Sequence, residues 1–271
     1  MSSDGNQLMK IGVFGLGEAG SLFAADLVAQ GQQVAGYDPA DVATPEGVER
    51  HCDPRETVSE ADVVIALTAS ADATTALEQA FDQLPSGCVY ADFSTGSAGL
   101  KQQLAATAER RHIAFVDVAL LAVVPGKGLR TPALASGSGA NAFCELFAPL
   151  GMPVDSLGPE AGDAATRKLL RSVFMKGLAA VTIEAMRGAE QAGLSQWLWE
   201  NLSQEVAAAD GALLHRLVTG THTHARRRLH EMEAAEALLQ ELDVDPVMTR
   251  STVENLKQVM TAGLPPLPAD N

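Results

Sequence analysis

A glycine-rich turn near the amino end of the sequence is the first group of residues whose spacing indicates a chemical role. It follows an apolar run at residues 10–14 and precedes a helical segment. Six residues form its G-x-G-x-x-G motif: Gly15, Leu16, Gly17, Glu18, Ala19 and Gly20. The first glycine would allow a tight turn, the second would let a pyrophosphate approach the backbone, and the third would let the helix pack closely on the strand. This arrangement is typical of a dinucleotide-binding site.

An acidic residue after the next expected strand supports that interpretation. The strand covers residues 33–37 and ends at Asp38. A carboxylate about 20 residues after the glycine turn is placed to bind the ribose hydroxyls of adenosine. Asp38 also favours NAD over NADP, because it would repel a 2′-phosphate and residues 39–41 contain no arginine. The alternative is a structural glycine turn in another kind of βαβ unit.

Short apolar runs alternate with helical segments up to about residue 150. Further strands are expected at residues 62–67, 88–93, 112–118 and 132–136. Runs of this kind are typical of parallel strands that are buried on both faces. The pattern predicts an α/β fold, a Rossmann-type doubly wound parallel sheet. Four residues directly after two of the strands are also expected to bind the cofactor: Thr68, Ala69, Ser94 and Thr95.

Strand patterns stop after Gly158, and the remaining sequence is almost wholly helical. We therefore predict a dinucleotide-binding domain at residues 9–159 and an all-helical domain for substrate binding and dimerisation at residues 160–262. The helix expected at Asp163–Gln191 is apolar over most of its circumference, which is typical of a core helix. A small helical domain could not cover so much apolar surface in a monomer, so a homodimer is expected.

Two basic residues on this long helix are candidates for catalysis. Lys168 and Arg171 share one face at about 100° per residue. An unpaired ammonium is costly to bury, so these groups are expected to face a cleft or a partner. The alternative for Lys168 is an ordinary solvent-exposed lysine. A second basic cluster, at residues 222–230, is expected on a later helix, where it would form a solvated face, a dimer contact or an anion site.

The amino-acid composition disfavours several classes of binding partner. The 34 acidic residues outnumber the 19 Lys and Arg residues, and a formal charge of −15 disfavours nucleic acid. Cys52, Cys88 and Cys144 lack C-x-x-C spacing, so reduced thiols in a cytoplasmic protein are expected and no metal site is indicated. Apolar runs are far shorter than the roughly 20 residues of a membrane span, so no membrane partner is expected.

With these motifs in place, the chain resembles the β-hydroxyacid dehydrogenase superfamily, which includes 3-hydroxyisobutyrate and 6-phosphogluconate dehydrogenases. The likeness covers about residues 9–260. The family's G-L-G-x-M-G matches the glycine turn, its D-x-S-T matches residues 92–95, and its G-x-G-x-x-x-K-x-x-N-N matches residues 162–172. The resemblance implies NAD(P)-dependent hydride transfer between the nicotinamide and a hydroxy acid or related carbonyl compound. It also makes Lys168 the expected general acid or base, and Arg171 could bind a substrate carboxylate or phosphate.

Two departures from the family pattern concern the small-molecule substrate. The family's D-A-P-V-S-G-G falls on residues 117–123, which keep only Asp117, and Arg171-Ser172 replaces Asn-Asn. These changes resemble a little-characterised branch with its own C-terminal domain. Leu121 and Val123 predict a pocket that disfavours small 3-hydroxy acids. An imine reductase and a non-catalytic nicotinamide-binding sensor remain alternatives, and burial near Arg171 would lower the pKa of Lys168.

Overall fold

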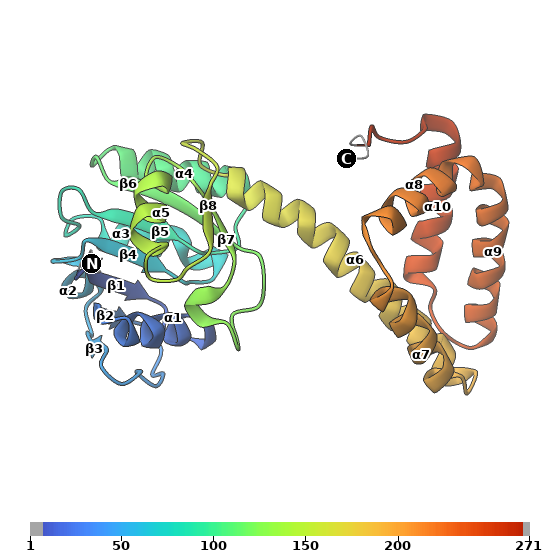
Figure 1. Ribbon diagram of the computed structural model, residues 1–271, viewed down its shortest axis with the longest axis horizontal. Helices are drawn as coiled ribbons and strands as arrows, with labels where there is room; N and C mark the ends of the chain where they lie inside the picture. The colour runs from blue at the N-terminus through green and yellow to red at the C-terminus, as the bar shows by residue number, and fades with distance from the viewer. Residues whose placement is uncertain (1–7, 268–271) are drawn as a thin grey trace, which may run out of the picture. The chain divides into compact units, whose positions relative to one another are not determined.

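The computed structural model describes residues 8–267 and divides into two compact units, one up to Arg171 and the other from Ser172. The division falls within one long helix, α6 (Asp163–Gln191) (Figure 1).

One mostly parallel sheet forms the centre of the first unit. Within residues 8–267 its strands are β1 (Lys10–Phe14), β2 (Gln33–Tyr37), β3 (Glu49–Arg50), β4 (Val63–Ala66), β5 (Val89–Asp92), β6 (Ala114–Leu120), β7 (Ala133–Ser136) and β8 (Val154–Ser156). Their order is β3-β2-β1-β4-β5-β6-β7-β8. Every neighbouring pair is parallel except β6 and β7. The loops after the parallel strands therefore leave the same edge of the sheet.

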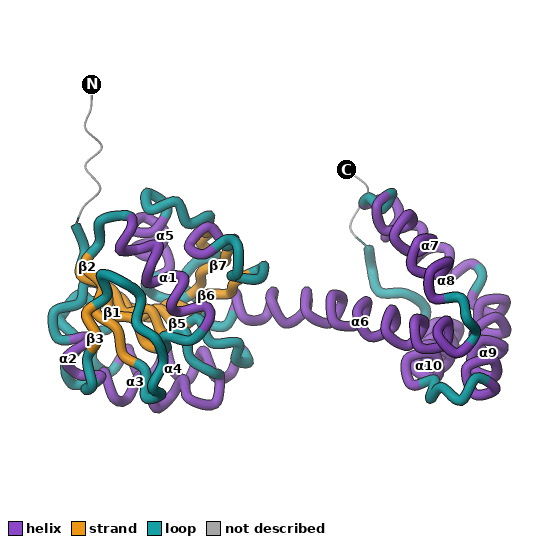
Figure 2. The backbone as a smooth tube through the Cα atoms, turned by 90° about the horizontal axis from the view of Figure 1, so that it is seen from below, coloured by secondary structure: helices purple, strands orange, loops and turns teal. Residues whose placement is uncertain are grey.

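Helices cover both faces of this sheet. Helices α1 (Glu18–Ala29) and α5 (Ala140–Phe147) lie on one face, and α2 (Pro54–Val58), α3 (Ala73–Ala80) and α4 (Ala98–Glu109) lie on the other (Figure 2). Side chains of β4 alternate between the two cores: Val63 and Ile65 join Phe23 of α1, while Val64 joins Leu77 of α3. The Rossmann-type fold is confirmed.

Three details differ from the prediction. Strand β7 is antiparallel because residues 121–132 hold a 3₁₀ turn, Gly128–Arg130, and not the crossover helix that a parallel return requires. Strands β3 and β8 and helix α2 were not predicted. They are too short to show a hydrophobic period.

The described part of the second unit is helical. Beyond α6 it contains α7 (Ser195–Ala207), α8 (Gly211–Thr223), α9 (Ala225–Glu241) and α10 (Val247–Ala262). Leu239 of α9 and Val253 and Leu256 of α10 are buried. No helix in residues 8–267 combines the length and the apolar character that crossing a membrane requires.

The carboxylate of Glu184, on α6, caps the amino-terminal end of α10. Glu184 accepts hydrogen bonds from the amides of Met248 (2.7 Å) and Thr249 (2.8 Å) and from the Thr249 hydroxyl (2.7 Å). Burial raises the pKa of Glu184, but the hydrogen bonds from Thr249 and the backbone outweigh this effect and leave the pKa lowered. The carboxylate thus supplies the cap that α10 lacks locally.

Two expectations for the helical part were wrong. Helix α6 is not a core helix within its own chain, because Leu170 is 68% exposed, Val173 74% and Phe174 52%. The basic cluster is not on one helix, because α8 ends at Thr223 and α9 begins at Ala225. Part of the cluster has a structural role, since the Arg228 guanidinium donates to Thr221 and to the Leu217 carbonyl of α8.

Candidate active site

The glycine turn between β1 and α1 is fixed by backbone sterics at two positions. Gly15 has a φ of +84°, and a Cβ there would lie 2.5 Å from the Leu67 carbonyl oxygen. A Cβ on Gly20 would lie 1.8 Å from the Gly15 carbonyl oxygen. No side chain fits at either position without a shift of backbone, so both glycines are required by the chain itself.

Gly17 differs from its two neighbours in the motif. A Cβ on Gly17 would meet no atom within 4 Å. The residue is the N-cap of α1, and no side chain caps that helix end. The first amides of α1, from Glu18 and Ala19 onwards, are therefore left without a side-chain cap beside open space, as binding of a pyrophosphate requires.

A pocket of about 300 Å³ lies beside this turn. Five of the residues predicted to bind the cofactor line it: Gly15, Gly17, Asp38, Thr68 and Ala69. The Thr68 hydroxyl oxygen is buried and, among the described residues, has no hydrogen-bond partner. An unpartnered polar atom and an open glycine in one pocket fit a dinucleotide with ribose and phosphate oxygens. Leu16, by contrast, is buried outside the pocket lining.

The carboxylate of Asp38 holds the glycine turn from the end of β2. It accepts the Leu16 amide at 2.7 Å and the Ala40 amide at 2.9 Å. Arg50 of β3 also reaches this segment, and its guanidinium donates to the carbonyls of Asp38 (2.8 Å) and Ala40 (3.0 Å). Sequence reasoning missed Arg50, which lies outside residues 39–41 and is brought there by a two-residue strand.

The loops after β1, β4 and β5 are neighbours at the sheet edge. A Cβ on Gly15 would touch Leu67, in the loop after β4. A Cβ on Gly96, in the loop after β5, would lie 3.3 Å from the Ser70 hydroxyl of the loop after β4. The loop that carries Ser94 and Thr95 therefore lies beside the loop after β4, which lines the pocket with Thr68 and Ala69.

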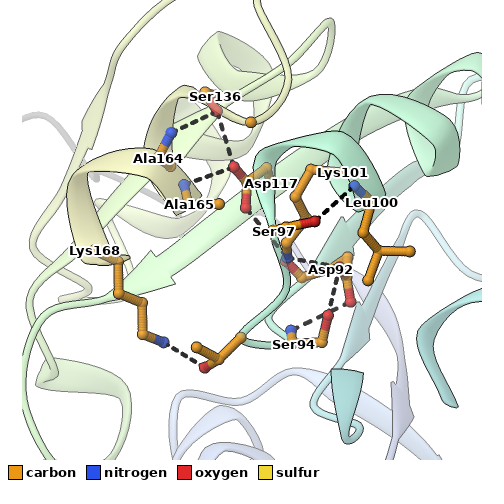
Figure 3. A network of polar contacts seen from close by, with 12 residues as sticks. Asp92, Ser94, Ser97, Leu100, Lys101, Asp117, Ser136, Ala164, Ala165 and Lys168 are labelled. Atoms are coloured by element: carbon orange, nitrogen blue, oxygen red, sulfur yellow. Dashed lines mark hydrogen bonds and ion pairs between the residues drawn. The ribbon is translucent and has the colours of Figure 1, made fainter. Parts of the chain in front are cut away.

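Lys168 meets this edge from the first turns of α6. Its Nζ donates to the Thr95 hydroxyl oxygen at 2.9 Å, and the side chain is half-buried (Figure 3). A residue predicted as catalytic and one predicted to bind the cofactor are thus in contact. Arg171, one turn later, is exposed, and its guanidinium has no hydrogen bond or ion pair within the described part of the chain.

A buried polar network is connected to Thr95 through the preceding residue, Ser94. The sequence did not predict this network. Lys101 of α4 is 0% exposed, and its Nζ lies 2.7 Å from Asp92 Oδ2 and 3.2 Å from Asp117 Oδ1 (Figure 3). Ser94 is also part of this network, because its hydroxyl donates to Asp92 Oδ2 at 2.8 Å. The structure places Ser94 in the buried layer beneath the site.

The loop after β6 presents apolar side chains. Val123 is 74% exposed, Leu121 is half-buried, and neither belongs to the two sheet cores. The loop is held at its ends, where Leu121 N–H donates to the Pro132 carbonyl and Leu129 N–H donates to Asp26. The side chains of Leu121 and Val123 are therefore accessible to a ligand, whereas Val124 and Leu129 of the same loop are buried in the core.

Comparison with known families agrees with this geometry. Residues 10–127 match the NAD binding domain of 6-phosphogluconate dehydrogenase, and residues 189–259 match a domain of unknown function, DUF1932. Together, the two matches fit the hydroxyacid dehydrogenase-like superfamily with its own C-terminal domain. The predicted resemblance is confirmed, including the separate C-terminal domain. The chain has an NAD(P)-binding dehydrogenase-like fold, and the match to the NAD binding domain indicates an NAD(P)-dependent oxidoreductase.

Three similar proteins extend the comparison. An uncharacterized 28.5 kDa protein of Methanothermus fervidus is 27% identical over 256 residues, which cover 93% of this chain and 99% of the relative. The reductive aminase of Aspergillus terreus in complex with NADPH and ethyl levulinate is 19% identical with a TM-score of 0.79, covering 95% of each chain. A variant imine reductase of Myxococcus stipitatus with NAD+ is 17% identical with a TM-score of 0.77, again covering 95% of each chain. The two likenesses to solved structures concern the fold.

Proposed function

We propose that this protein transfers a hydride between NAD and a hydroxy acid or a related alcohol or carbonyl compound, with Lys168 as general acid or base. The observation that carries the proposal is the 2.9 Å hydrogen bond from Lys168 to Thr95. It brings an amine to the sheet edge that also forms the dinucleotide pocket. A nicotinamide cofactor supplies or accepts the hydride when it is bound.

Lys168 and Thr95 can handle the proton together. The ammonium can donate a proton to a carbonyl oxygen as that carbon is reduced, and the neutral amine can accept one from a hydroxyl. The Thr95 hydroxyl accepts from Lys168 and keeps its own hydrogen for donation. The two groups are therefore suited to orient one substrate oxygen between them.

Arg171 is suited to bind the anionic end of a substrate. It lies one turn from Lys168 on α6 and is exposed. A guanidinium has five donors in a planar fork that matches a carboxylate or phosphate. A substrate with an acid group a few bonds from its reacting carbon would engage both residues.

NAD remains the proposed cofactor. Two carboxylates, Asp38 and Asp72, line the pocket and disfavour the extra charge of a 2′-phosphate. Arg50 lies close to Asp38, but its guanidinium already donates hydrogen bonds to the carbonyl oxygens of Asp38 and Ala40. Fluorescence titration with NADH and NADPH tests the preference, and tighter binding of NADPH would show that Arg50 receives the phosphate instead.

Imine reduction is the second candidate. It is favoured by the likeness of fold to a reductive aminase and an imine reductase, and the same lysine could supply the proton. A panel of carbonyl compounds with NADH, run with and without an added amine, separates the two reactions. Oxidation of NADH that needs the amine would favour imine reduction. Cofactor binding without turnover across the panel would favour the non-catalytic sensor.

We also propose a homodimer. Leu170, Val173 and Phe174 form an exposed apolar run on α6, and Trp197 and Trp199 of α7 are exposed as well. Apolar surface of this extent is typical of an interface between subunits. Light scattering at micromolar concentration is expected to give twice the 28.3 kDa chain mass, and a monomer would contradict the proposal.

A further inference from the structure

Lys101 is completely buried, and the proposed chemistry does not use it. Its Nζ donates to the Asp92 carbonyl (3.1 Å) and carboxylate (2.7 Å) and pairs with Asp117 (3.2 Å). A long cationic side chain is rarely buried unless its charge is fully paired. Burying one ammonium and two carboxylates costs desolvation free energy, so a role in function is more plausible than a role in packing alone.

The second carboxylate of the network holds the start of α6. Asp117 Oδ2 accepts the Ala165 amide at 2.9 Å and lies 3.3 Å from the Ser136 hydroxyl, which accepts the Ala164 amide at 3.0 Å. The positive end of the helix dipole thereby faces an anion. Lys168 follows Ala165 by three residues on the same helix. Asp117 therefore fixes the turn from which the Lys168 side chain extends.

Asp92, the other carboxylate of the network, holds the loop that carries Thr95, the partner of Lys168. Asp92 accepts both the amide (3.2 Å) and the hydroxyl (2.8 Å) of Ser94, and Ser94 directly precedes Thr95. The contacts thus form a closed ring: from Lys168 to Thr95, through Ser94 and Asp92 to Lys101, then through Asp117 to the first turn of α6 (Figure 3). Lys101 is the link between its two halves.

We propose that Lys101 is a positioning residue that holds the Lys168 amine against Thr95. It joins Asp92 at the end of β5 to Asp117 in the middle of β6, and through them it sets the distance between the loop after β5 and helix α6. The role in catalysis rests on the proposed function, whereas the positioning itself can be measured without a substrate.

The first test is the double variant Lys101→Met and Asp92→Asn. It removes one buried cation and one buried anion, so the net charge of the network is unchanged and Asp117 still caps α6. The side-chain link between the β5 loop and α6 is lost, while the backbone pairing of β5 with β6 is retained. The readout is the rate at which acetic anhydride labels Lys168, relative to Lys176 of the same helix, in mass spectra of the digested protein.

Lys168 labelling is expected to rise about threefold to tenfold over Lys176, as weakening of one hydrogen bond would allow. An unchanged ratio in a variant with wild-type circular dichroism would overturn the proposal. If the double variant does not fold, Ser94→Ala decides, since it removes one link of the ring without changing a charge. Its matched control is Ser138→Ala, which removes a hydroxyl that accepts the Phe115 amide outside the ring. The ratio is expected to rise for Ser94→Ala alone, and an equal rise in both would count against the ring.

Turnover separates this inference from the proposed function. On the best compound of the carbonyl panel, the double variant is expected to lose about tenfold to a hundredfold in kcat, the scale of a misplaced catalytic group, with the Kd for NADH unchanged. In a Lys168→Ala background the same change is expected to cost nothing further, because the group that it positions is gone. A further loss in that background would show a general structural role and overturn the inference. Faster labelling of Lys168 together with an active Lys168→Ala enzyme would support positioning and refute the proposed function.

Discussion

The loops after β1 and β6 leave the same edge of one sheet but are built on different principles. The β1 loop is fixed by its backbone, because Cβ atoms on Gly15 and Gly20 would collide with carbonyl oxygens. The β6 loop is held at its ends and exposes Val123 between them. Backbone geometry tolerates little change and suits a constant ligand such as a dinucleotide. Exposed side chains can vary, and they suit the part of the site that selects a substrate.

Lys168, the proposed catalytic residue, contacts Thr95 in the loop after β5, and β5 lies between β1 and β6 in the sheet. Its removal gives the sharpest test of whether the edge is one site. Lys168→Ala is expected to lower kcat by about 10² to 10⁴, the usual contribution of general acid–base catalysis. The Kd for NADH should stay nearly unchanged, because the pocket is lined by other loops. Steady-state kinetics and fluorescence titration measure the two effects.

Lys176→Ala is the matched control for that experiment, since Lys176 is an exposed lysine on the same helix. It should retain wild-type turnover. A Lys168→Ala enzyme that keeps more than about a tenth of its activity, or a Lys176→Ala enzyme that loses it, would assign the proton transfer elsewhere.

In the glycine turn, two roles of glycine can be separated: leaving space for the ligand and allowing close packing of the backbone. Gly17→Ala should cost little stability, on the order of 1 kcal/mol from the N-cap position, because its Cβ meets no protein atom within 4 Å. It should weaken NADH binding by about tenfold or more, since the Cβ would project into the space proposed for the pyrophosphate. Gly20→Ala, with a contact of 1.8 Å, should instead lower the unfolding midpoint. Equal effects of the two substitutions on NADH affinity at full stability would contradict this division of roles.

The same contrast explains what could be predicted from the sequence. The strand, glycine turn, helix and Asp38 lie within 29 residues, from Lys10 to Asp38, and local patterns specify them. Lys101 and Ser136 were missed because their partners come from other strands, and no spacing along the chain marks them. Arg50 was missed for the same reason.

Two errors have a related physical origin. An apolar helix surface shows that something must cover α6, but not whether the cover comes from the same chain. The break at His224 between α8 and α9 carries no glycine or proline, so the basic cluster reads as one helix. Local sequence specifies which elements form far better than it specifies their partners.

The β6 loop predicts a preference among substrates. An aryl-substituted hydroxy acid should show a higher kcat/KM than 3-hydroxyisobutyrate, by about tenfold or more, because a buried apolar side chain contributes roughly 1.5 to 3 kcal/mol. Val123→Ser should reduce that preference. Val206→Ser, at an exposed valine of α7, is the matched control. A higher kcat/KM for the small acid would refute the altered pocket.

The smallest expected effect concerns a long-range contact in the helical unit, where Glu184 caps α10 from 64 and 65 residues away. The pKa of Glu184 is lowered in the folded state, so its contribution to stability is present above the ordinary value of 4.5 and is lost as pH falls through the folded value. Glu184→Gln should therefore lower the free energy of unfolding by about 1 to 3 kcal/mol near neutral pH, the scale of hydrogen bonds to a charged group. The difference from wild type should shrink below about pH 4, where the wild-type carboxylate also gains its proton. Urea unfolding at both pH values measures this, with Glu190→Gln at an exposed position of α6 as the control. A difference that is independent of pH would mean that the shape of the side chain, and not its charge, holds the start of α10.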